Sequence, residues 1–542
     1  MHVPVLIIGG GPVGLSTSVM LSRHGIANIL VEKSPSTTYH PRARSVNTRT
    51  LEIFRQWGIE EHLREVSLPP AWSKEMIYTT NLSGPEVGRV KTGSMSVLPN
   101  EGLSPCGYML SSQDKIEPIL RAAAESYPSA DVRFGFEFVS FEMGDNGVQA
   151  VIKDVMSDDT ETIEADYLVG ADGVWSRVRD LLGYHLEGEQ NVAYSINTYF
   201  KADLSKWIEH RPSSLYWISQ ASRAGVLQPL DGGDRWLCQI GLAGDDTIKD
   251  GWTEEHSAAW IKEAVGDDSV PVEILKILPW TMSATVANHF YNGRVFLLGD
   301  AVHQLPPTGG FGMNSGVQDA HNLAWKLAAV LNGWAGESLL ETYESERRSV
   351  AQGNATWSLT NFRAVQKITR AAMGGTAEEK AAAVEQAHHY GNWMGNEFGF
   401  GYESAAVIPD GTEPPHVDNP SEDYAPTARP GHRAPHLELE GPDGRFSILG
   451  LFDKKMVLLA GADGKAWVEA AYKAAGKIPL DAWCIGPDGD FKDPDGAWDK
   501  AYGIEPSGAV LVRPDGHVAW RCPQVNDDPA STIENVLKQI LG

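Results

Sequence analysis

The sequence has 542 residues, which is too long for a single hydrophobic core, and this length predicts about three domains. Hydrophobic residues make up 42% and charged residues 21% of the chain, as is ordinary for a water-soluble globular protein. The net charge of −26 argues against a nucleic-acid-binding surface, because such a surface needs a basic face.

The four cysteines form neither a CxxC pair nor a metal-ligand spacing. This usage predicts reduced thiols, a cytoplasmic location and no metal site. The first apolar run ends in glycines and has no basic segment before it, so we expect neither a signal peptide nor a membrane span.

A glycine-rich turn, GGGPVG at residues 9–14, follows an apolar run at residues 5–8 that predicts a buried parallel strand. Residues 15–23 predict a helix, and a second predicted strand at 29–31 ends at Glu32. This order is the βαβ fingerprint of dinucleotide binding, in which the helix N-terminus faces the pyrophosphate and the acid binds the adenosine ribose. The residues expected to bind the dinucleotide here are Gly9, Gly11, Pro12, Gly14, Glu32 and Lys33.

Two further strand–turn–helix motifs follow, GADGVWSRVR at residues 170–179 and LGDA at 298–301, the latter running on to a Pro/Gly turn. Each places an aspartate at a strand end, where sheets of this kind bind ligands. A helix expected to start near Met313 would direct its N–H groups at the part of the cofactor where negative charge develops. The cofactor-binding candidates of these motifs are Asp172, Asp300, Pro307, Gly310, Gly312, Met313 and Asn314.

Each later motif alone is equally compatible with an ordinary strand–turn–helix connection. The first motif alone does not separate FAD from NAD, because both cofactors use the same fingerprint. The three motifs in this order indicate FAD.

The three motifs, together with HPRA at residues 40–43, RTLEIF at 49–54 and SQDKIE at 112–117, resemble the single-component FAD-dependent aromatic hydroxylases. The resemblance covers residues 3–350 and is greatest to the phenol and polyketide hydroxylases. It implies that Arg42 lies near the FAD pyrophosphate and the nicotinamide nucleotide. It also implies that Gln113 and Asp300 meet the flavin ribityl chain, and that Asp172 takes part in FAD and NAD(P)H binding.

The resemblance implies an NAD(P)H-dependent monooxygenase that hydroxylates a phenolic or polycyclic polyketide-type aromatic substrate with O2, through a flavin C4a-hydroperoxide. FAD would be the resident cofactor, and NADPH or NADH a transient reductant, because the sequence shows no second nucleotide fingerprint. Two alternatives stay open: a Baeyer–Villiger-type oxygenation on the same scaffold, and a non-catalytic flavin-bearing binding protein.

No proton-transfer residue can be named from the sequence. Some phenol hydroxylases of this branch carry an aspartate five positions before the Arg-Thr pair, where this chain has Arg44. Arg44, His303 and Pro307 are therefore the catalytic candidates, although a packing or turn role suits His303 equally well.

Alternating apolar and polar residues over 186–285 predict an antiparallel sheet, to which residues 71–103 add strands. One face of this sheet should cover the flavin. The substrate-contact candidates are Tyr216, Trp217, Arg223 and Trp236, but packing within the sheet core is the better interpretation for any single aromatic residue.

The predicted fold class is α/β, a Rossmann-like FAD-binding domain of the GR2 type with an inserted antiparallel-sheet substrate domain and a C-terminal thioredoxin-like domain. The FAD-binding domain with its following helices comprises 1–70, 104–185 and 286–400, and the substrate domain 71–103 and 186–285. Residues 401–428 are rich in turn formers and predict a linker. Residues 429–542 predict the thioredoxin-like domain, which lacks CxxC and is expected to be redox-inactive, with a structural or oligomerisation role, so that a homodimer is a candidate assembly.

Overall fold

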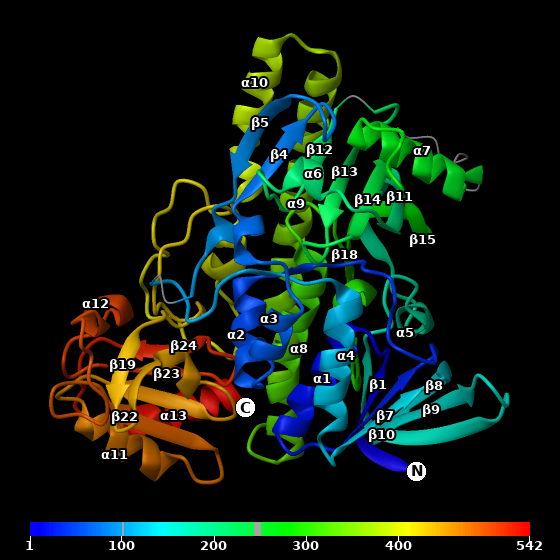
Figure 1. Cartoon of the computed structure of the whole chain (residues 1–542). Helices are drawn as coiled ribbons and strands as arrows, with labels where there is room; N and C mark the ends of the chain where they lie inside the picture. The colour runs from blue at the N-terminus through cyan, green and yellow to red at the C-terminus, as the bar shows by residue number, and fades with distance from the viewer. Residues whose placement is uncertain (100–101, 220, 243–250) are drawn as a thin grey trace.

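The computed structural model describes residues 1–99, 102–219, 221–242 and 251–542. In this part of the chain, two eight-stranded sheets and a smaller C-terminal sheet surround a pair of long helices, α8 (Phe311–Leu331) and α9 (Ser338–Gly374). Figure 1 shows these helices in the middle of the molecule, with the C-terminal unit beside them.

The first sheet has the strand order β16-β17-β10-β1-β2-β7, and the β8–β9 hairpin continues from β10. The pairs along β17-β10-β1-β2-β7 are all parallel. Parallel strands that are covered on both faces need continuous apolar runs, as in residues 5–7, which have no exposed surface. The strands are β1 (His2–Ile8), β2 (Asn28–Glu32), β7 (Ala130–Phe134), β8 (Phe136–Gly144), β9 (Gly147–Asp154), β10 (Thr160–Gly170), β16 (Tyr291–Asn292) and β17 (Val295–Leu297).

Helix α1 (Pro12–Arg23) packs against both α4 (Gln113–Glu125) and α8 beside this sheet. The remaining helices of this region and a small two-stranded sheet connect the first sheet to the rest of the protein. They are β3 (Ser45–Val46), α2 (Thr48–Gln56), α3 (Glu60–Glu65), β6 (Met109–Leu110) and α5 (Arg177–Leu181).

The second sheet has the order β18-β15-β11-β14-β13-β12-β4-β5 and is antiparallel except for the β12–β4 pair. It joins strands from the two predicted segments, 71–103 and 186–285, and adds the short strand β18, which the sequence does not predict. One face packs under α7 (Glu254–Val265), where Phe200, Trp236 and Trp260 are buried. The opposite face meets α9 and α10 (Ala377–Glu385). The other elements are β4 (Glu75–Thr79), β5 (Glu86–Lys91), β11 (Leu186–Lys201), α6 (Ser205–Ile208), β12 (Tyr216–Ile218), β13 (Gly225–Pro229), β14 (Arg235–Gly241), β15 (Glu273–Ala287) and β18 (His303–Gln304).

The C-terminal sheet has the order β22-β21-β23-β24, with a parallel β21–β22 pair and antiparallel pairs on the other side. This arrangement is the thioredoxin-like part of the predicted fold class. Its elements are β19 (Glu438–Gly441), β20 (Gly444–Ser447), β21 (Met456–Ala460), α11 (Lys465–Ala474), β22 (Leu480–Cys484), α12 (Trp498–Tyr502), β23 (Ala509–Val512), β24 (Val518–Cys522) and α13 (Pro529–Leu541).

Residues 401–428 contain no helix or strand, yet they are held firmly against both neighbours. The Ser404 hydroxyl donates to Glu346 Oε1 of α9 at 2.6 Å, and Arg521 of β24 donates to Asp410 at 2.7 Å. Tyr402 is buried and accepts a hydrogen bond from Arg347 at 3.0 Å. The division into domains stays a prediction, but this segment is an ordered bridge between α9 and the C-terminal unit.

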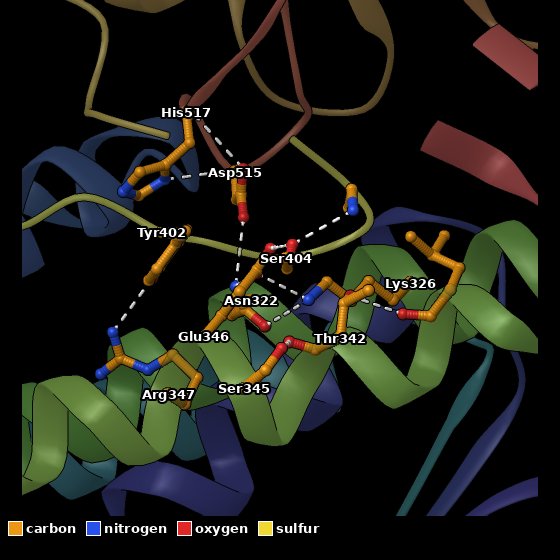
Figure 2. A network of polar contacts seen from close by, with 12 residues as sticks. Asn322, Lys326, Thr342, Ser345, Glu346, Arg347, Tyr402, Ser404, Asp515 and His517 are labelled. Atoms are coloured by element: carbon orange, nitrogen blue, oxygen red, sulfur yellow. Dashed lines mark hydrogen bonds and ion pairs between the residues drawn. The ribbon is translucent and has the colours of Figure 1, made fainter. Parts of the chain in front are cut away.

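Buried charges join that unit to the central helices. Figure 2 shows Glu346 of α9 among Lys326, Asn322 and Ser404, with Asp515 reaching Asn322 from the C-terminal unit. Lys326 donates to Glu346 at 2.7 Å, and neither side chain has exposed surface. Such a network stabilises only when every charge keeps its partner.

Candidate functional site

The register of the first sheet brings the three sequence motifs to one edge. Ile8 of β1 pairs with Gly170 of β10, and Gly170 pairs with Leu297 of β17. The residues that follow each strand therefore emerge side by side at the carboxyl end of the sheet, where parallel sheets bind ligands.

Glycine is required by space at two positions of the first turn. Gly9 has φ +109°, and a Cβ there would lie 2.3 Å from the Ala171 carbonyl oxygen; a Cβ at Gly14 would lie 1.9 Å from the Gly9 carbonyl oxygen. Gly11, the N-cap of α1, has no atom within 4 Å of such a Cβ and receives no side-chain cap, and Pro12 follows as the first helical residue. The N–H groups of this helix end are thus open to an anion.

Glu32 stands at the end of β2 beside the same turn. Its carboxylate oxygens accept from the Gly10 N–H and the Ser34 N–H, both at 2.8 Å. A Cβ at Gly10 would lie 2.6 Å from Glu32 Cβ, so the turn and the acid are in direct contact. Lys33 is exposed next to it.

Asp172 shapes the second motif. Its carboxylate accepts from the Ser176 hydroxyl at 2.5 Å and from the Val178 N–H at 3.1 Å, so it holds the start of α5. Burial raises the pKa of this carboxyl. From the same helix, Arg179 donates to the Ala301 carbonyl at 3.0 Å and thereby ties the second motif to the third.

Asp300, three residues after the end of β17, is exposed, and its side chain makes no hydrogen bond with any other residue that the structure describes. The surrounding protein still removes enough water to raise the pKa of its carboxyl, against the smaller opposing attraction of His303 and Arg42. A Cβ at Gly312 would lie 3.8 Å from Asp300 Oδ1, so the carboxylate lies beside the first turn of α8.

Helix α8 begins on a left-handed glycine, Gly310 with φ +70°, and its N-terminus has no side-chain cap. The Gly310 N–H donates to the Pro307 carbonyl at 3.0 Å, which closes the Pro/Gly turn. Asn314 donates to the Gly310 and Ser45 carbonyls at 2.6 and 2.9 Å, whereas Met313 is half-buried against the core. Asn314 is therefore a tether between the turn and the Ser45 segment rather than a free donor.

The predicted pair Arg42 and Gln113 lies on a neighbouring loop and helix. Gln113 N–H donates to the Ala43 carbonyl at 2.7 Å, and its side-chain oxygen accepts from the Ala43 N–H at 3.3 Å. Arg42 is exposed, and its charge influences Asp300. Gln113 thus positions the loop that presents Arg42 to the strand-end site.

Arg44 leaves that loop toward the second sheet. Its Nε donates to Gln228 Oε1 at 2.8 Å and its Nη2 to the Ser214 carbonyl at 2.6 Å. Burial lowers the pKa of this guanidinium to about 10. Arg44 cannot act as a base near neutral pH, because its guanidinium stays protonated there.

The structure adds Asp319, which the motifs do not indicate. One of its oxygens accepts from the Gly299 N–H at 3.1 Å and lies 2.7 Å from His303 Nε2, while the other accepts from Arg347 Nε at 2.7 Å. None of these three side chains has exposed surface. Burial would raise the pKa of Asp319, but Arg347 and His303 outweigh it and hold the carboxyl ionised.

His303 is thereby a wholly enclosed partner of Asp319, a position that favours the packing role over catalysis. The pair anchors Gly299, the residue next to Asp300. An acid in the middle of the apolar helix α8 is the sequence signal that could have revealed this anchor, because such acids are almost never buried without a partner.

The four substrate-contact candidates lie on different faces of the second sheet. Tyr216 and Trp236 have no exposed surface and pack under α7, where the Tyr216 hydroxyl donates to the Arg211 carbonyl at 2.8 Å. Arg223 lies beside α7 over the Trp252 ring. Trp217 faces the opposite side, where Tyr78 stacks on it at 6.1 Å. Only Trp217 therefore shares the face that Arg44 reaches.

These features fit a flavin dinucleotide. Two helix N-termini without caps, an open backbone at Gly11 and an unbonded carboxylate at Asp300 meet at one sheet edge. Among the described residues no cluster of His, Cys, Asp and Glu could hold a metal ion. No helix in the same set of residues is long and apolar enough to cross a membrane.

Two family models match the chain: "FAD binding domain" over residues 2–358 and "Aromatic-ring hydroxylase, C-terminal" over residues 427–542. A 2,4-dichlorophenol 6-monooxygenase of Delftia acidovorans is 36% identical over 99% of this chain and 98% of that protein. A crystal structure of the flavin-dependent monooxygenase PieE, in complex with FAD and substrate, aligns with TM-score 0.92 and 35% identity over 99% of both chains. An aklavinone-11 hydroxylase with FAD and aklavinone aligns with TM-score 0.88 and 34% identity, again over 99% of both chains.

The matches cover the chain from the glycine-rich turn to the C-terminal unit, and they confirm the predicted fold class and the predicted cofactor. The chain therefore belongs to the FAD-dependent aromatic hydroxylases and is a flavoprotein monooxygenase.

Proposed function

We propose that this monooxygenase uses NAD(P)H and O2 to hydroxylate a phenolic or polycyclic polyketide-type aromatic ring. The observation that carries the proposal is the placement of the second sheet. Arg44 connects the loop at the strand-end site to β13 and to the segment before β12, so the face that bears Trp217 lies next to the expected flavin position. An aromatic wall beside a flavin suits a flat, electron-rich substrate.

We propose the following cofactor contacts. The open N–H groups at Gly11 and Pro12 bind the FAD pyrophosphate, with Gly9 and Gly14 shaping the turn, and Glu32 and Lys33 bind the adenosine. Asp300 accepts from ribityl hydroxyls, since its oxygens have no other partner among the described residues. Gly310 and Gly312 open the N-terminus of α8 toward the flavin pyrimidine edge. FAD, when bound, supplies electron transfer from the nicotinamide and the activation of O2; the protein supplies orientation and exclusion of water.

The reductant is proposed to dock transiently at Arg42. This guanidinium is exposed and its charge influences Asp300, and the described sheets contain one glycine-rich dinucleotide turn, which the flavin needs. Asp172 contributes by holding the turn of the second motif at the start of α5. Either NADH or NADPH is compatible with docking at Arg42.

Purified protein tests the proposal. The yellow holoenzyme should consume NAD(P)H faster when a phenolic or polycyclic ligand is added, and mass spectrometry with ¹⁸O2 should find one labelled oxygen on a ring carbon. Label inserted between a carbonyl and its neighbour would establish the Baeyer–Villiger alternative instead. If no compound in a broad panel stimulates flavin reduction or yields product, a flavin-bearing binding role replaces hydroxylation.

The cellular location and assembly are also proposed. Four free cysteines among the described residues suit a reducing, cytoplasmic environment. Light scattering of the holoenzyme decides between a monomer and the homodimer considered from the sequence.

A further inference from the structure

Glu117 of α4 is a buried carboxylate that is held by hydrogen bonds rather than by a counterion. The residue is 3% exposed, and none of the described cations forms an ion pair with it. Its Oε2 accepts from the Thr38 N–H at 2.7 Å, and its Oε1 accepts from Gln113 Nε2 at 2.5 Å. A buried carboxylate is costly unless such donors are present. Both donors belong to the contact between α4 and the loop that carries Arg42.

Glu117 holds this loop at two points. The loop joins β2 to β3 and contains neither helix nor strand. One point is Thr38, which Glu117 contacts directly. The other is Ala43, whose N–H donates to the Gln113 side-chain oxygen at 3.3 Å and whose carbonyl accepts from the Gln113 N–H at 2.7 Å. Residues 38–43, called the arch below, are therefore fixed to α4 at both ends.

The exposed Arg42 belongs to the arch. Its N–H donates to the His40 carbonyl at 2.9 Å, and the His40 N–H donates to the Thr38 hydroxyl at 3.2 Å. These internal bonds connect the position of Arg42 to that of Thr38. A charge that is fixed before its ligand arrives loses less entropy on binding, so the hold on the two ends should strengthen any contact that Arg42 makes.

Glu117 also determines which way the Gln113 amide faces. An ionised carboxylate only accepts, so it faces Gln113 Nε2 and leaves Oε1 for the Ala43 N–H. The reverse orientation would place two acceptors together at Glu117 and two donors together at Ala43. A proton taken from water removes this preference, because the new O–H needs an acceptor, and Gln113 Oε1 can serve only by turning away from Ala43. Protonation would thus release one end of the arch.

We propose that Glu117 is a positioning residue for reduction of the flavin, and that in its ionised form it holds both ends of the arch and so presents Arg42 to the nicotinamide nucleotide. This inference rests on the proposed docking of the reductant at Arg42. It adds a residue that acts on the nucleotide through Thr38 and Gln113 and not by contact.

The hold on the arch should weaken in acid. Burial raises the pKa of the Glu117 carboxyl, while its hydrogen bonds and Arg42 oppose this rise and Glu32 adds to it. Other charges on α4 and on the elements packed against it are already paired, namely Asp114 with Arg235, Arg121 with Glu125, Arg23 with Asp453, Glu60 with Arg64 and Asp131 with Arg133. Glu117 should therefore take up its proton at a higher pH than an exposed glutamate does.

Anaerobic stopped-flow reduction of the holoenzyme by NADH and by NADPH tests the proposal. At about pH 8, Glu117→Gln should raise the apparent dissociation constant of the nucleotide about 5- to 50-fold, because one oxygen that accepts is replaced by a group that donates. The limiting rate constant of reduction should change by less than about twofold, since the hydride transfer itself is untouched. Glu125→Gln, at an exposed glutamate of the same helix, should leave both values unchanged.

The pH profile separates positioning from a purely structural role. Glu117→Gln resembles the protonated state at every pH, so the ratio of its dissociation constant to that of the wild type should fall toward one as the pH is lowered from about 8 to about 5. Groups common to both proteins, and the NADPH 2′-phosphate, cancel in this ratio. In a Gln113→Ala background, Glu117→Gln should have a smaller effect, because part of its action passes through that amide.

FAD occupancy and thermal melting report whether each variant folds. If Glu117→Gln does not retain FAD, Glu117→Asp is used. Its side chain is one methylene shorter and cannot reach both donors, so it should raise the apparent dissociation constant of the nucleotide about threefold or more and keep the dependence on pH.

A lowered melting temperature with normal nucleotide binding would overturn the proposal. A variant-to-wild-type ratio that is equal at every pH, or effects of Glu117→Gln and Gln113→Ala that multiply, would do the same. If Arg42→Ala leaves nucleotide binding unchanged, the proposed docking at Arg42 has failed. If Arg42→Ala weakens binding and Glu117→Gln does not, only the role of Glu117 has failed, so the two failures are distinguishable.

Discussion

Arg513 donates hydrogen bonds to both carboxylate oxygens of Glu346, at 2.6 and 2.9 Å, and neither side chain has exposed surface. Arg513 belongs to the C-terminal unit and Glu346 to α9. The next residue of α9, Arg347, holds Asp319, which in turn anchors Gly299 beside the flavin-binding aspartate proposed here. A continuous set of contacts therefore links the C-terminal unit to the strand-end site.

Removal of Arg513 should destabilise the whole protein. Arg513→Met leaves Glu346 and Asp515 with fewer counterions in a closed environment, and we expect a loss of about 3–5 kcal/mol in the free energy of unfolding. Urea denaturation followed by far-UV circular dichroism measures it. Arg445→Met, at an exposed arginine of the same unit, should change stability by less than about 0.5 kcal/mol. The linkage would be contradicted if the C-terminal unit of the variant unfolded in a separate transition while the midpoint of the other transition stayed at the wild-type value.

Glu397 should make the protein less stable as pH rises. It is 2% exposed, and burial, which outweighs its hydrogen bond from the Arg49 N–H, raises the pKa of its carboxyl from 4.5 to about 7. A raised pKa gives stability that is complete below pH 4.5 and is lost as pH rises through 7. At about 1.4 kcal/mol for each pH unit between the two values, Glu397→Gln should gain about 3 kcal/mol over the wild type at pH 8 and nothing at pH 4. Equal stability differences at both pH values would refute this.

Asp319→Asn should weaken FAD binding from a distance. The substitution removes the charge that balances Arg347 and disturbs the contact with Gly299, so FAD occupancy and melting temperature should fall together. Flavin absorbance per protein and differential scanning calorimetry measure the two effects. Asp166→Asn, at a partly exposed aspartate that pairs with His2, serves as the control. Full FAD occupancy with a lowered melting temperature would show that Asp319 stabilises the fold but does not support FAD binding.

Asp300→Ala should reduce FAD affinity directly, about 5- to 150-fold, because ribityl hydroxyls of the bound cofactor would lose acceptors that water could not fully replace. Isothermal titration of the apoprotein with FAD gives the dissociation constant. An affinity equal to that of the wild type would show that the carboxylate does not touch the cofactor.

Arg42→Ala should slow flavin reduction and leave substrate binding almost unchanged. Arg42 is exposed and lies on the loop that Gln113 holds, apart from the aromatic face of the sheet. Anaerobic stopped-flow reduction by NAD(P)H should show at least about a tenfold rise in the apparent dissociation constant of the nucleotide, from the loss of a charge-assisted contact. Equal damage to substrate and nucleotide binding would argue that the loop itself has collapsed.

The strand-end motifs were predictable because each is local: a buried strand, a glycine turn and an acid lie within a few residues of one another. Gly9, Asp172 and Asp300 therefore meet where the sequence places them. Asp319 was not predictable from a motif, because its partners come from β18 and α9 and only the folded packing of α8 brings them together.

The same limit applied to the two faces of the second sheet. Alternation separates Tyr216 from Trp217 but does not say which side α7 covers, and the segments that decide it are distant in sequence. Tyr390, which meets Trp217 edge-on at 6.3 Å, comes from the 3-10 helix Gln386–Gly391 after α10, where neither periodicity nor a motif predicts a contact with this face.

The pairing of Arg513 with Glu346 has a consequence for recombination between members of this family. A chimera that joins the first 400 residues of one enzyme to the C-terminal unit of another would bury an unmatched charge unless the two parents supply a matching pair at positions 346 and 513. Exchange of substrate preference is better attempted by grafting β12 and β13, because these strands lie outside the Glu346 network.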